Sequence, residues 1–182
     1  MRPRLLVATL FATALCFSTP APASEWQATL LGFKMVIPDE GWSSAKPNQP
    51  NLRIARKKPD LTLFAFSANP LTAQVAASVA QSPETAEKIM QSIVAAANEQ
   101  YAKARGKEGT IPTQKTTVDG VLAYRFLAPP VAYPNNLTLH TEFILWVHRG
   151  HILSLTLISP GIPAAENPEL AALVKSIRLE KP

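Results

Sequence analysis

The feature that most constrains the fold of this chain is a pair of alternating apolar segments separated by a two-residue turn. Residues 114–118 and 121–127 flank Asp119-Gly120. Both turn residues tolerate the positive φ angles that a two-residue hairpin turn requires. The sequence therefore predicts a tight β-hairpin in the second half of the chain.

A second and longer hairpin is expected immediately afterwards. Residues 137–148 and 151–159 have strand-like composition and meet at Arg149-Gly150. Between the two hairpins, residues 128–136 contain three prolines. Proline cannot donate to a strand ladder, so we expect this segment to be an exposed loop rather than a strand.

Three further strands are expected in the first half of the chain. Residues 30–37 alternate between apolar and polar side chains and stop at a Pro- and Gly-containing turn before Trp42. Residues 52–57 and 61–67 flank Pro59-Asp60 and predict another hairpin.

Helix starts are marked by a polar residue followed by proline, because the side chain can cap the helix and proline loses nothing at the first helical position. Three such pairs occur, at Asn69-Pro70, Ser82-Pro83 and Asn167-Pro168. The main helix is expected from Pro83 to Arg105, with Gly106 as its stop. A brief helix before it, with Leu71, Val75 and Val79, and a short closing helix complete the set. We expect the apolar stripes of all three helices to face the core.

This order of elements predicts an α+β domain, in which an antiparallel sheet of about six to seven strands is covered by helices. The Ile37-Pro38-Asp39-Glu40-Gly41-Trp42 junction, the Asp119-Gly120 hairpin and a closing segment Val174-Lys175-Ser176-Ile177-Arg178 resemble the PsbP-like superfamily. That group includes photosystem II PsbP, the Ran-binding Mog proteins and DcrB-like bacterial envelope proteins. The resemblance spans nearly all of the chain after residue 23. It implies an α/β/α sandwich and a non-enzymatic, partner-binding protein, although a fold alone does not assign a function.

The N-terminus has the three parts of a secretory signal. Arg2 and Arg4 form a positive end, residues 5–17 are apolar, and Ala21-Pro22-Ala23 is a small-residue cleavage site. We expect residues 1–23 to be removed and residues 24–182 to form one domain in the periplasm or outside the cell. Two alternatives are a membrane anchor, for which the apolar run is short, and a lipoprotein acylated at Cys16.

Composition narrows the chemistry of the mature chain. The sequence is 47% hydrophobic and 17% charged, which is typical of a folded domain rather than a disordered one. Removing 23 of the 182 residues, Arg2 and Arg4 among them, leaves 159 residues with 16 basic and 13 acidic side chains and no cysteine. Disulfides and cysteine-based metal sites are then excluded, and a net charge of +3 does not favour nucleic acid as a partner.

No catalytic motif emerges from the sequence, so we expect a protein that is not an enzyme and holds no cofactor. Serines occur, but none lies in a Gly-x-Ser-x-Gly elbow. His148 and His151 should lie opposite each other across the second hairpin turn, whereas His140 is eight residues away along the strand. Two ligands do not close a zinc site. We therefore expect a solvated turn there and no metal.

Two features are candidates for contact with a partner or ligand. Four cations fall within six residues, namely Arg53, Arg56, Lys57 and Lys58. They serve either as a charged edge that blocks strand addition or as a surface for an acidic partner. Trp42 and Tyr133 are expected in loops, where an aromatic ring acts as a lid or interface anchor or simply packs locally. Trp146 is expected in the core.

The preferred hypothesis is an exported, non-enzymatic domain that binds another envelope or secreted protein. Within it, an accessory subunit of an envelope assembly and an immunity protein that neutralises a toxin both remain open. The alternative is a small-molecule or lipid binding protein with a pocket between helix and sheet, gated by the Pro-rich loop around Tyr133. The weakest alternative is a metal-binding protein that uses His148 and His151.

Overall fold

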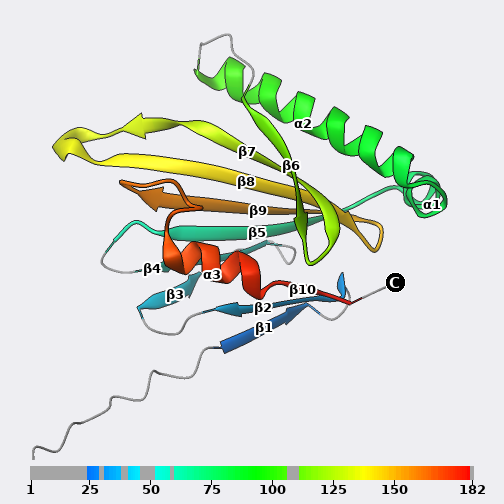
Figure 1. The fold of residues 1–182 in the computed structure, drawn as a ribbon, viewed down its shortest axis with the longest axis horizontal. Coiled ribbons are helices and arrows are strands. Elements are labelled where there is room, and N and C mark those ends of the chain that lie inside the picture. Colours follow the sequence, from blue (N-terminus) through cyan, green and yellow to red (C-terminus); the bar gives the residue numbers. More distant parts are fainter. Residues whose placement is uncertain are drawn as a thin grey trace, which may run out of the picture.

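A computed structural model of the chain describes residues 24–28, 31–37, 41–45, 52–57, 60–105 and 111–180 (Figure 1). The predicted signal at residues 1–23 and its cleavage site lie outside the described residues. The elements in chain order are β1 (Ser24–Ala28), β2 (Phe33–Ile37), β3 (Trp42–Ala45), β4 (Leu52–Lys57), β5 (Leu63–Pro70), α1 (Ala73–Gln81), α2 (Pro83–Arg105), β6 (Thr113–Val118), β7 (Val121–Ala132), a short 3-10 helix η2 (Pro134–Asn136), β8 (Thr138–His148), β9 (His151–Pro160), α3 (Pro168–Ser176) and β10 (Arg178–Leu179).

The strands form two antiparallel sheets. Seven strands lie in the order β3-β4-β5-β9-β8-β7-β6, and three more lie in the order β1-β2-β10. All strand pairs are antiparallel. The expected α+β class and the sheet of six to seven strands are confirmed. The three-stranded sheet is an addition, because β1 and β10 have no counterpart in the sequence analysis.

The two predicted turns organise the larger sheet. Asp119 and Gly120 adopt φ angles of 47° and 82°, and Arg149 and Gly150 adopt 44° and 70°. These positive angles match the twist of the flanking strands, so β6–β7 and β8–β9 pair without a register shift next to the turns.

Each face of the seven-stranded sheet has its own covering layer (Figure 1). On one face, Met90 and Val94 of α2 pack against Tyr124, Phe126 and Leu145 of the sheet. On the other face, α3 and the three-stranded sheet lie together, as Figure 1 shows with α3 beside β2 and β10. The covering layer on that side is therefore mixed.

The larger core lies under this mixed layer. Its fully buried side chains include Phe33 of β2, Phe66 of β5, Trp146 of β8 and Leu170 of α3. The rings of Phe33 and Phe66 stack with centroids 4.5 Å apart. Burying an aromatic or aliphatic side chain of this size contributes about 1.5–3 kcal/mol. These contacts hold the two sheets together, and they confirm that Trp146 belongs to the core.

The helices begin close to the expected positions, with one exception. α2 runs from Pro83 to Arg105 as predicted, and the Asn167 side chain caps α3 by accepting from the backbone N–H groups of Glu169 and Leu170. The helix start predicted at Asn69-Pro70 is wrong, because these two residues end β5 and the N-cap of α1 is Thr72. The prediction that the apolar stripe of α1 faces the core is also wrong, since no residue of α1 is buried.

Two strand predictions are corrected as well. The exposed loop predicted over residues 128–136 is largely strand, because β7 continues to Ala132. Pro129 and Pro130 fall at a register shift where two residues of β7 oppose one of β8, so their missing N–H groups break no regular ladder. The strand predicted over residues 30–37 is β2, which begins at Phe33.

Candidate functional site

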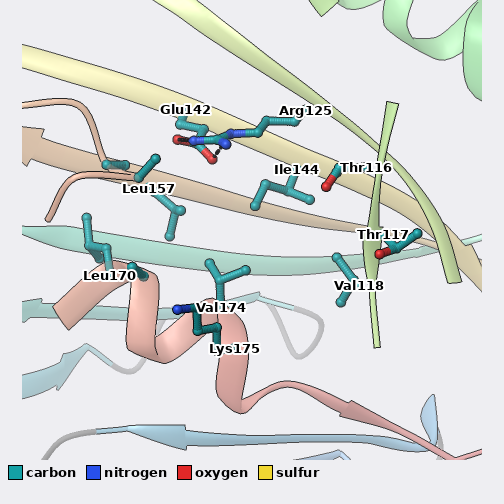
Figure 2. Close-up of a pocket in the computed structure, with 13 residues that line it drawn as sticks. Thr116, Thr117, Val118, Arg125, Glu142, Ile144, Leu157, Leu170, Val174 and Lys175 are labelled. Atoms are coloured by element: carbon teal, nitrogen blue, oxygen red, sulfur yellow. Dashed lines mark hydrogen bonds and ion pairs between the residues drawn. The ribbon is translucent and has the colours of Figure 1, made fainter. Parts of the chain in front are cut away.

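A groove lies beside α3, between this helix and the β6 edge of the large sheet (Figure 2). Its volume is about 170 Å³. We call it the α3 groove. Most of its lining is apolar and comes from β6, the central strands, α3 and the segment before α3. The apolar side chains are those of Val118, Ile144, Leu157, Ala164, Ala165, Leu170, Ala171 and Val174.

Two of the polar side chains of the α3 groove, Arg125 and Glu142, are paired with each other. Arg125 Nε lies 2.6 Å from Glu142 Oε1, and Arg125 Nη2 donates to Glu142 Oε2 at 2.7 Å. The Glu142 side chain is 3% exposed and that of Arg125 is 26% exposed. A two-contact pair of this kind fixes both groups in place. It presents no net charge to a molecule that enters the groove.

One cation at the mouth of the α3 groove differs from this pair. Lys175 lines the groove from the last turn of α3 and is exposed. Its ammonium group has no ion-pair partner among the residues that the structure describes. Two exposed apolar side chains, Leu127 and Ile162, are close in sequence to residues that line the groove. Leu127 is two residues beyond Arg125 and opposite Glu142 in the ladder, and Ile162 precedes the Ala164 lining segment.

A second and larger cleft lies at the end of the large sheet that carries the two hairpin turns. It has a volume of about 810 Å³ and lies between α1, the two hairpin turns and the end of β10. We call it the α1 cleft. Its apolar lining comes from both α1 and the sheet, and includes Ala76, Val79, Ala80, Val121, Val147 and Leu179.

Hydrogen bonds and an ion pair hold the walls of the α1 cleft in place. The Asp119 carboxylate accepts from the Leu179 N–H at 2.8 Å. The Arg149 guanidinium lies 3.2 Å from the Glu180 carboxylate, and the Glu180 N–H donates to the Gly32 carbonyl at 2.8 Å. These contacts tie the C-terminal segment to both hairpin turns.

His148 lies at the α1 cleft and is buried, with 7% of its surface exposed. The expectation of a solvated turn with polar ends is therefore wrong for this residue. Burial lowers the pKa of His148, and the neighbouring Arg149 charge lowers it further. Nearby backbone at Gly32 and Glu180 favours the protonated ring, but Nε2 has no hydrogen-bond partner of acceptable geometry among the described residues.

His148 and His151 lie opposite each other across the turn, as predicted. His151 is half-buried, and its Nδ1 lies 2.9 Å from the Arg149 carbonyl oxygen in the adjacent turn. Within the described ranges, no three His, Cys, Asp or Glu side chains gather where they could hold a metal ion.

Trp42 and Tyr133 are both predicted to lie in loops, and the structure corrects the first prediction and agrees with the second. Trp42 is not in a loop, because it begins β3 and its ring packs on Phe64 with centroids 5.5 Å apart. This residue is half-buried and acts in local packing. Tyr133 lies between β7 and η2 and is 50% exposed, so it stays available as a surface contact.

The four predicted cations do not form one uniform surface. Arg56 is exposed on β4. Lys57 forms an ion pair with Glu169 of α3, so it joins the sheet to that helix. The side chain of Arg53 and the whole of Lys58 lie outside the described residues. Whether this hairpin contacts a partner stays a prediction.

Sequence reasoning missed the Arg125–Glu142 pair, the α1 cleft and the burial of His148. A signal for the pair existed in the strand alternation. Arg125 and Glu142 occupy the same phase as Ala123 and Ile144, which are buried in the larger core. Charged residues at inward positions of neighbouring strands indicate a buried pair.

No helix in the described part of the chain is both long and apolar enough to cross a bilayer.

Comparison with known proteins defines the fold. No family model matches the sequence, and no curated protein matches it. The solution structure of cyanobacterial PsbP (CyanoP) from Synechocystis sp. PCC 6803 superposes with a TM-score of 0.55 at 13% identity, over 91% of this chain and 97% of that one. A crystal structure from Bacteroides thetaiotaomicron VPI-5482 superposes with a TM-score of 0.54 at 9% identity, over 87% of this chain and 49% of that one. The chain thus spans about half the length of the Bacteroides protein. It has a PsbP-like fold, as the resemblance in the sequence predicted.

Proposed function

We propose that the chain is an exported, non-enzymatic domain that binds another envelope or secreted protein through the α3 groove. The size of the groove is the observation that supports this proposal. A cavity of roughly 150 Å³ accommodates a benzene-sized group, whereas small-molecule sites usually enclose about 300–1,000 Å³. At about 170 Å³, the α3 groove suits a single apolar side chain of a partner protein.

The edge strand beside the groove supports the same proposal. In the described part of the chain, β6 pairs only with β7. Val118 and Val121 close the two-residue turn, so Thr116 and Gln114 also bond inward to β7. The backbone groups of Thr113, Lys115 and Thr117 therefore point outward. An extended segment of a partner can bond to these groups as an added strand.

The side chains of β6 match this arrangement. Thr116, Thr117 and Val118 line the α3 groove. Because Thr116 and Val118 share one face of β6, alternate side chains of an added strand would face the same groove. Lys115 is held on the opposite face by its ion pair with Glu87 of α2. Lys175 at the groove mouth has no ion-pair partner among the described residues, which favours a partner protein with an acidic residue beside its apolar one.

A pair of tryptophan substitutions on α3 tests this proposal. Ala171 lines the α3 groove, whereas Ala172 is its exposed neighbour. The full chain and its Ala171→Trp and Ala172→Trp variants are expressed with the signal, and crosslinked complexes from the periplasm are identified by mass spectrometry. We expect one protein to be recovered with the wild type and Ala172→Trp and to be lost with Ala171→Trp. Equal recovery with all three, or a chain that stays in the cytoplasm, would contradict the proposal.

The identity of that protein separates the two remaining roles. An accessory subunit should be recovered with other members of an envelope assembly. An immunity protein should be recovered with a secreted toxin, and its deletion should cost the cell protection in a competition assay. Both roles use the same groove, so Ala171→Trp should impair either one.

A second candidate function has its own supporting observation. The α1 cleft has a volume of about 810 Å³, which falls in the range of small-molecule sites. It lies between a helix and the sheet, as the alternative hypothesis requires. Tyr133 is a lining residue of neither pocket, so the Pro-rich segment is not proposed as a gate.

A further inference from the structure

The α1 cleft has an apolar wall that the fold itself leaves uncovered. Ala76, Val79 and Ala80 line it from α1, and none of them is buried. Helix α1 is nevertheless fixed at its base. Leu71 N–H donates to the Gly150 carbonyl at 2.8 Å, and a Cβ on Gly150 would meet the Ala76 methyl group at 3.5 Å. A positioned helix with an apolar, unburied face is a wall for an apolar molecule.

The sheet side of the cleft supplies a matching apolar surface and one unsatisfied polar atom. Val121, Val147 and Leu179 line that side. His148 lines it too, and its Nε2 is buried without a hydrogen-bond partner among the described residues. A buried polar atom without a hydrogen-bond partner destabilises the folded state. A ligand atom that bonds to Nε2 would remove this cost.

Contact with Nε2 requires a local opening, because water does not reach this atom in the structure. The backbone beside the ring belongs to Gly32 and Glu180, so the opening has to occur at the short C-terminal segment that includes β10, whose one buried side chain is Leu179. Segments with few buried apolar contacts open at low free energy. A ligand therefore reaches the ring when this short segment is displaced, while α1 stays in place as the apolar wall.

The charged groups around the cleft disfavour an anionic ligand. Arg149 is paired with Glu180, and Asp119 accepts from the Leu179 N–H. Burial favours the neutral form of His148 by lowering its pKa. The remaining formal charge is the negative charge of Asp119, which opposes a carboxylate or phosphate.

We propose that the α1 cleft binds a small uncharged molecule, whose apolar body lies against α1 and whose single hydrogen-bonding group contacts His148. This inference rests on the second proposed function and goes beyond it by naming the ligand class and the polar contact. Pockets that are mostly apolar and hold a few convergent polar groups are typical small-molecule sites.

The test uses N-phenyl-1-naphthylamine, a neutral fluorescent probe with an apolar body and one N–H group. Fluorescence titration compares the wild type with Ala76→Trp, which fills the cleft, and Ala77→Trp, which adds the same side chain at an exposed site of α1 outside the lining. We expect saturable binding to the wild type and Ala77→Trp, and at least tenfold weaker binding to Ala76→Trp. No saturable binding to the wild type, or equal binding to both variants, overturns the inference together with the second proposed function.

Two further measurements separate the inference from that function. His148→Phe keeps a buried ring but removes the hydrogen bond, so it should weaken probe binding about three- to tenfold, whereas His151→Phe should not. Dodecanol should displace the probe at lower concentration than dodecanoate. If Ala76→Trp abolishes binding but His148→Phe does not alter it, the cleft remains a small-molecule site and the His148 contact is wrong. If dodecanoate competes better, the uncharged ligand class is wrong.

Discussion

Arg125 of β7 and Glu142 of β8 form a two-contact ion pair, at 2.6 and 2.7 Å, on the face of the sheet that α3 covers. The two residues are diagonal neighbours in the ladder, because Arg125 lies opposite Ile144 and Glu142 lies opposite Leu127. Their charges cancel at the α3 groove. A partner's apolar side chain can therefore approach an apolar surface that carries no net charge there.

The pair predicts an asymmetric response to substitution. Glu142→Ala leaves Arg125 desolvated without a partner, and we expect a loss of roughly 2–4 kcal/mol in the free energy of unfolding, somewhat below the ~3–5 kcal/mol of a fully buried pair because Arg125 keeps some contact with water. The double variant Arg125→Met, Glu142→Leu should unfold within about 1 kcal/mol of the wild type. Urea denaturation measures both, and a double variant as unstable as the single one would contradict this account.

The contact between the two sheets gives a second prediction. Phe33 of β2 is fully buried and stacks on Phe66 of β5. Phe33→Ala should lower the free energy of unfolding by about 3–5 kcal/mol, the usual cost of this truncation in a packed core. Val36→Ala on the same strand, at an exposed position, should change it by less than about 0.5 kcal/mol. Similar losses for both variants in urea denaturation would mean that the small sheet is not anchored through Phe33.

The parts of the fold that were predictable from the sequence are those fixed by neighbouring residues. Asp119-Gly120 and Arg149-Gly150 set their turns through backbone conformation, and Asn167 caps α3 through groups two and three residues away. These choices involve only local geometry, so the chain reveals them before any tertiary contact is known.

The parts that were not predictable depend on distant residues. β10 is two residues long and becomes a strand only by pairing with β2. Pro129 and Pro130 stay within β7 because the facing strand β8 allows a register shift there. His148 is polar and next to a turn, yet it is buried because the C-terminal segment is tied to both hairpins. Long-range packing overrides local preference at each of these positions.

A close contact at Gly32 provides a third prediction. Gly32 has a φ of 56°, and a Cβ there would lie 2.6 Å from the Arg149 guanidinium carbon. Gly161 has a φ of 78° with nothing within 4 Å. Both Gly→Ala variants should lose about 1–2 kcal/mol through the positive φ. Gly32→Ala should also displace Arg149 from Glu180, so that Glu180→Gln costs nothing further in this background. If Glu180→Gln lowered the free energy of unfolding as much in the Gly32→Ala background as in the wild type, the ion pair between Arg149 and Glu180 would have survived.

The lowered pKa of His148 gives a fourth prediction, on pH. Its folded-state pKa lies below the ordinary value of 6.5, so below about pH 6.5 the unfolded chain binds more protons than the folded one. The free energy of unfolding should therefore be highest above pH 6.5 and fall as the pH drops through the folded pKa. His148→Phe should flatten this dependence between pH 6.5 and 5, and His151→Phe should not. Urea denaturation at several pH values measures this dependence. If the free energy of unfolding of His148→Phe changed with pH as steeply as that of the wild type, the lowered pKa of His148 would be contradicted.

The register of β6 makes the final prediction, because neighbouring positions on this strand have opposite backbone roles. Thr116 bonds to Ala123 of β7, while the N–H of Thr117 points away from β7. Proline is tolerated on an edge strand where its missing N–H faces solvent. Thr117→Pro should therefore fold with a loss of less than about 1 kcal/mol, while Thr116→Pro should lose about 1–3 kcal/mol for a broken ladder bond.

The same substitution separates folding from partner binding. If an extended partner segment adds to β6, Thr117→Pro removes one of the hydrogen bonds that it would use and places the proline ring in its path. We expect Thr117→Pro to remain folded in urea denaturation and to lose the protein that crosslinks to the wild type. Undiminished crosslinking by a folded Thr117→Pro would contradict strand addition. If Ala171→Trp still abolished crosslinking, the α3 groove alone would account for recognition, through an inserted side chain rather than a paired backbone.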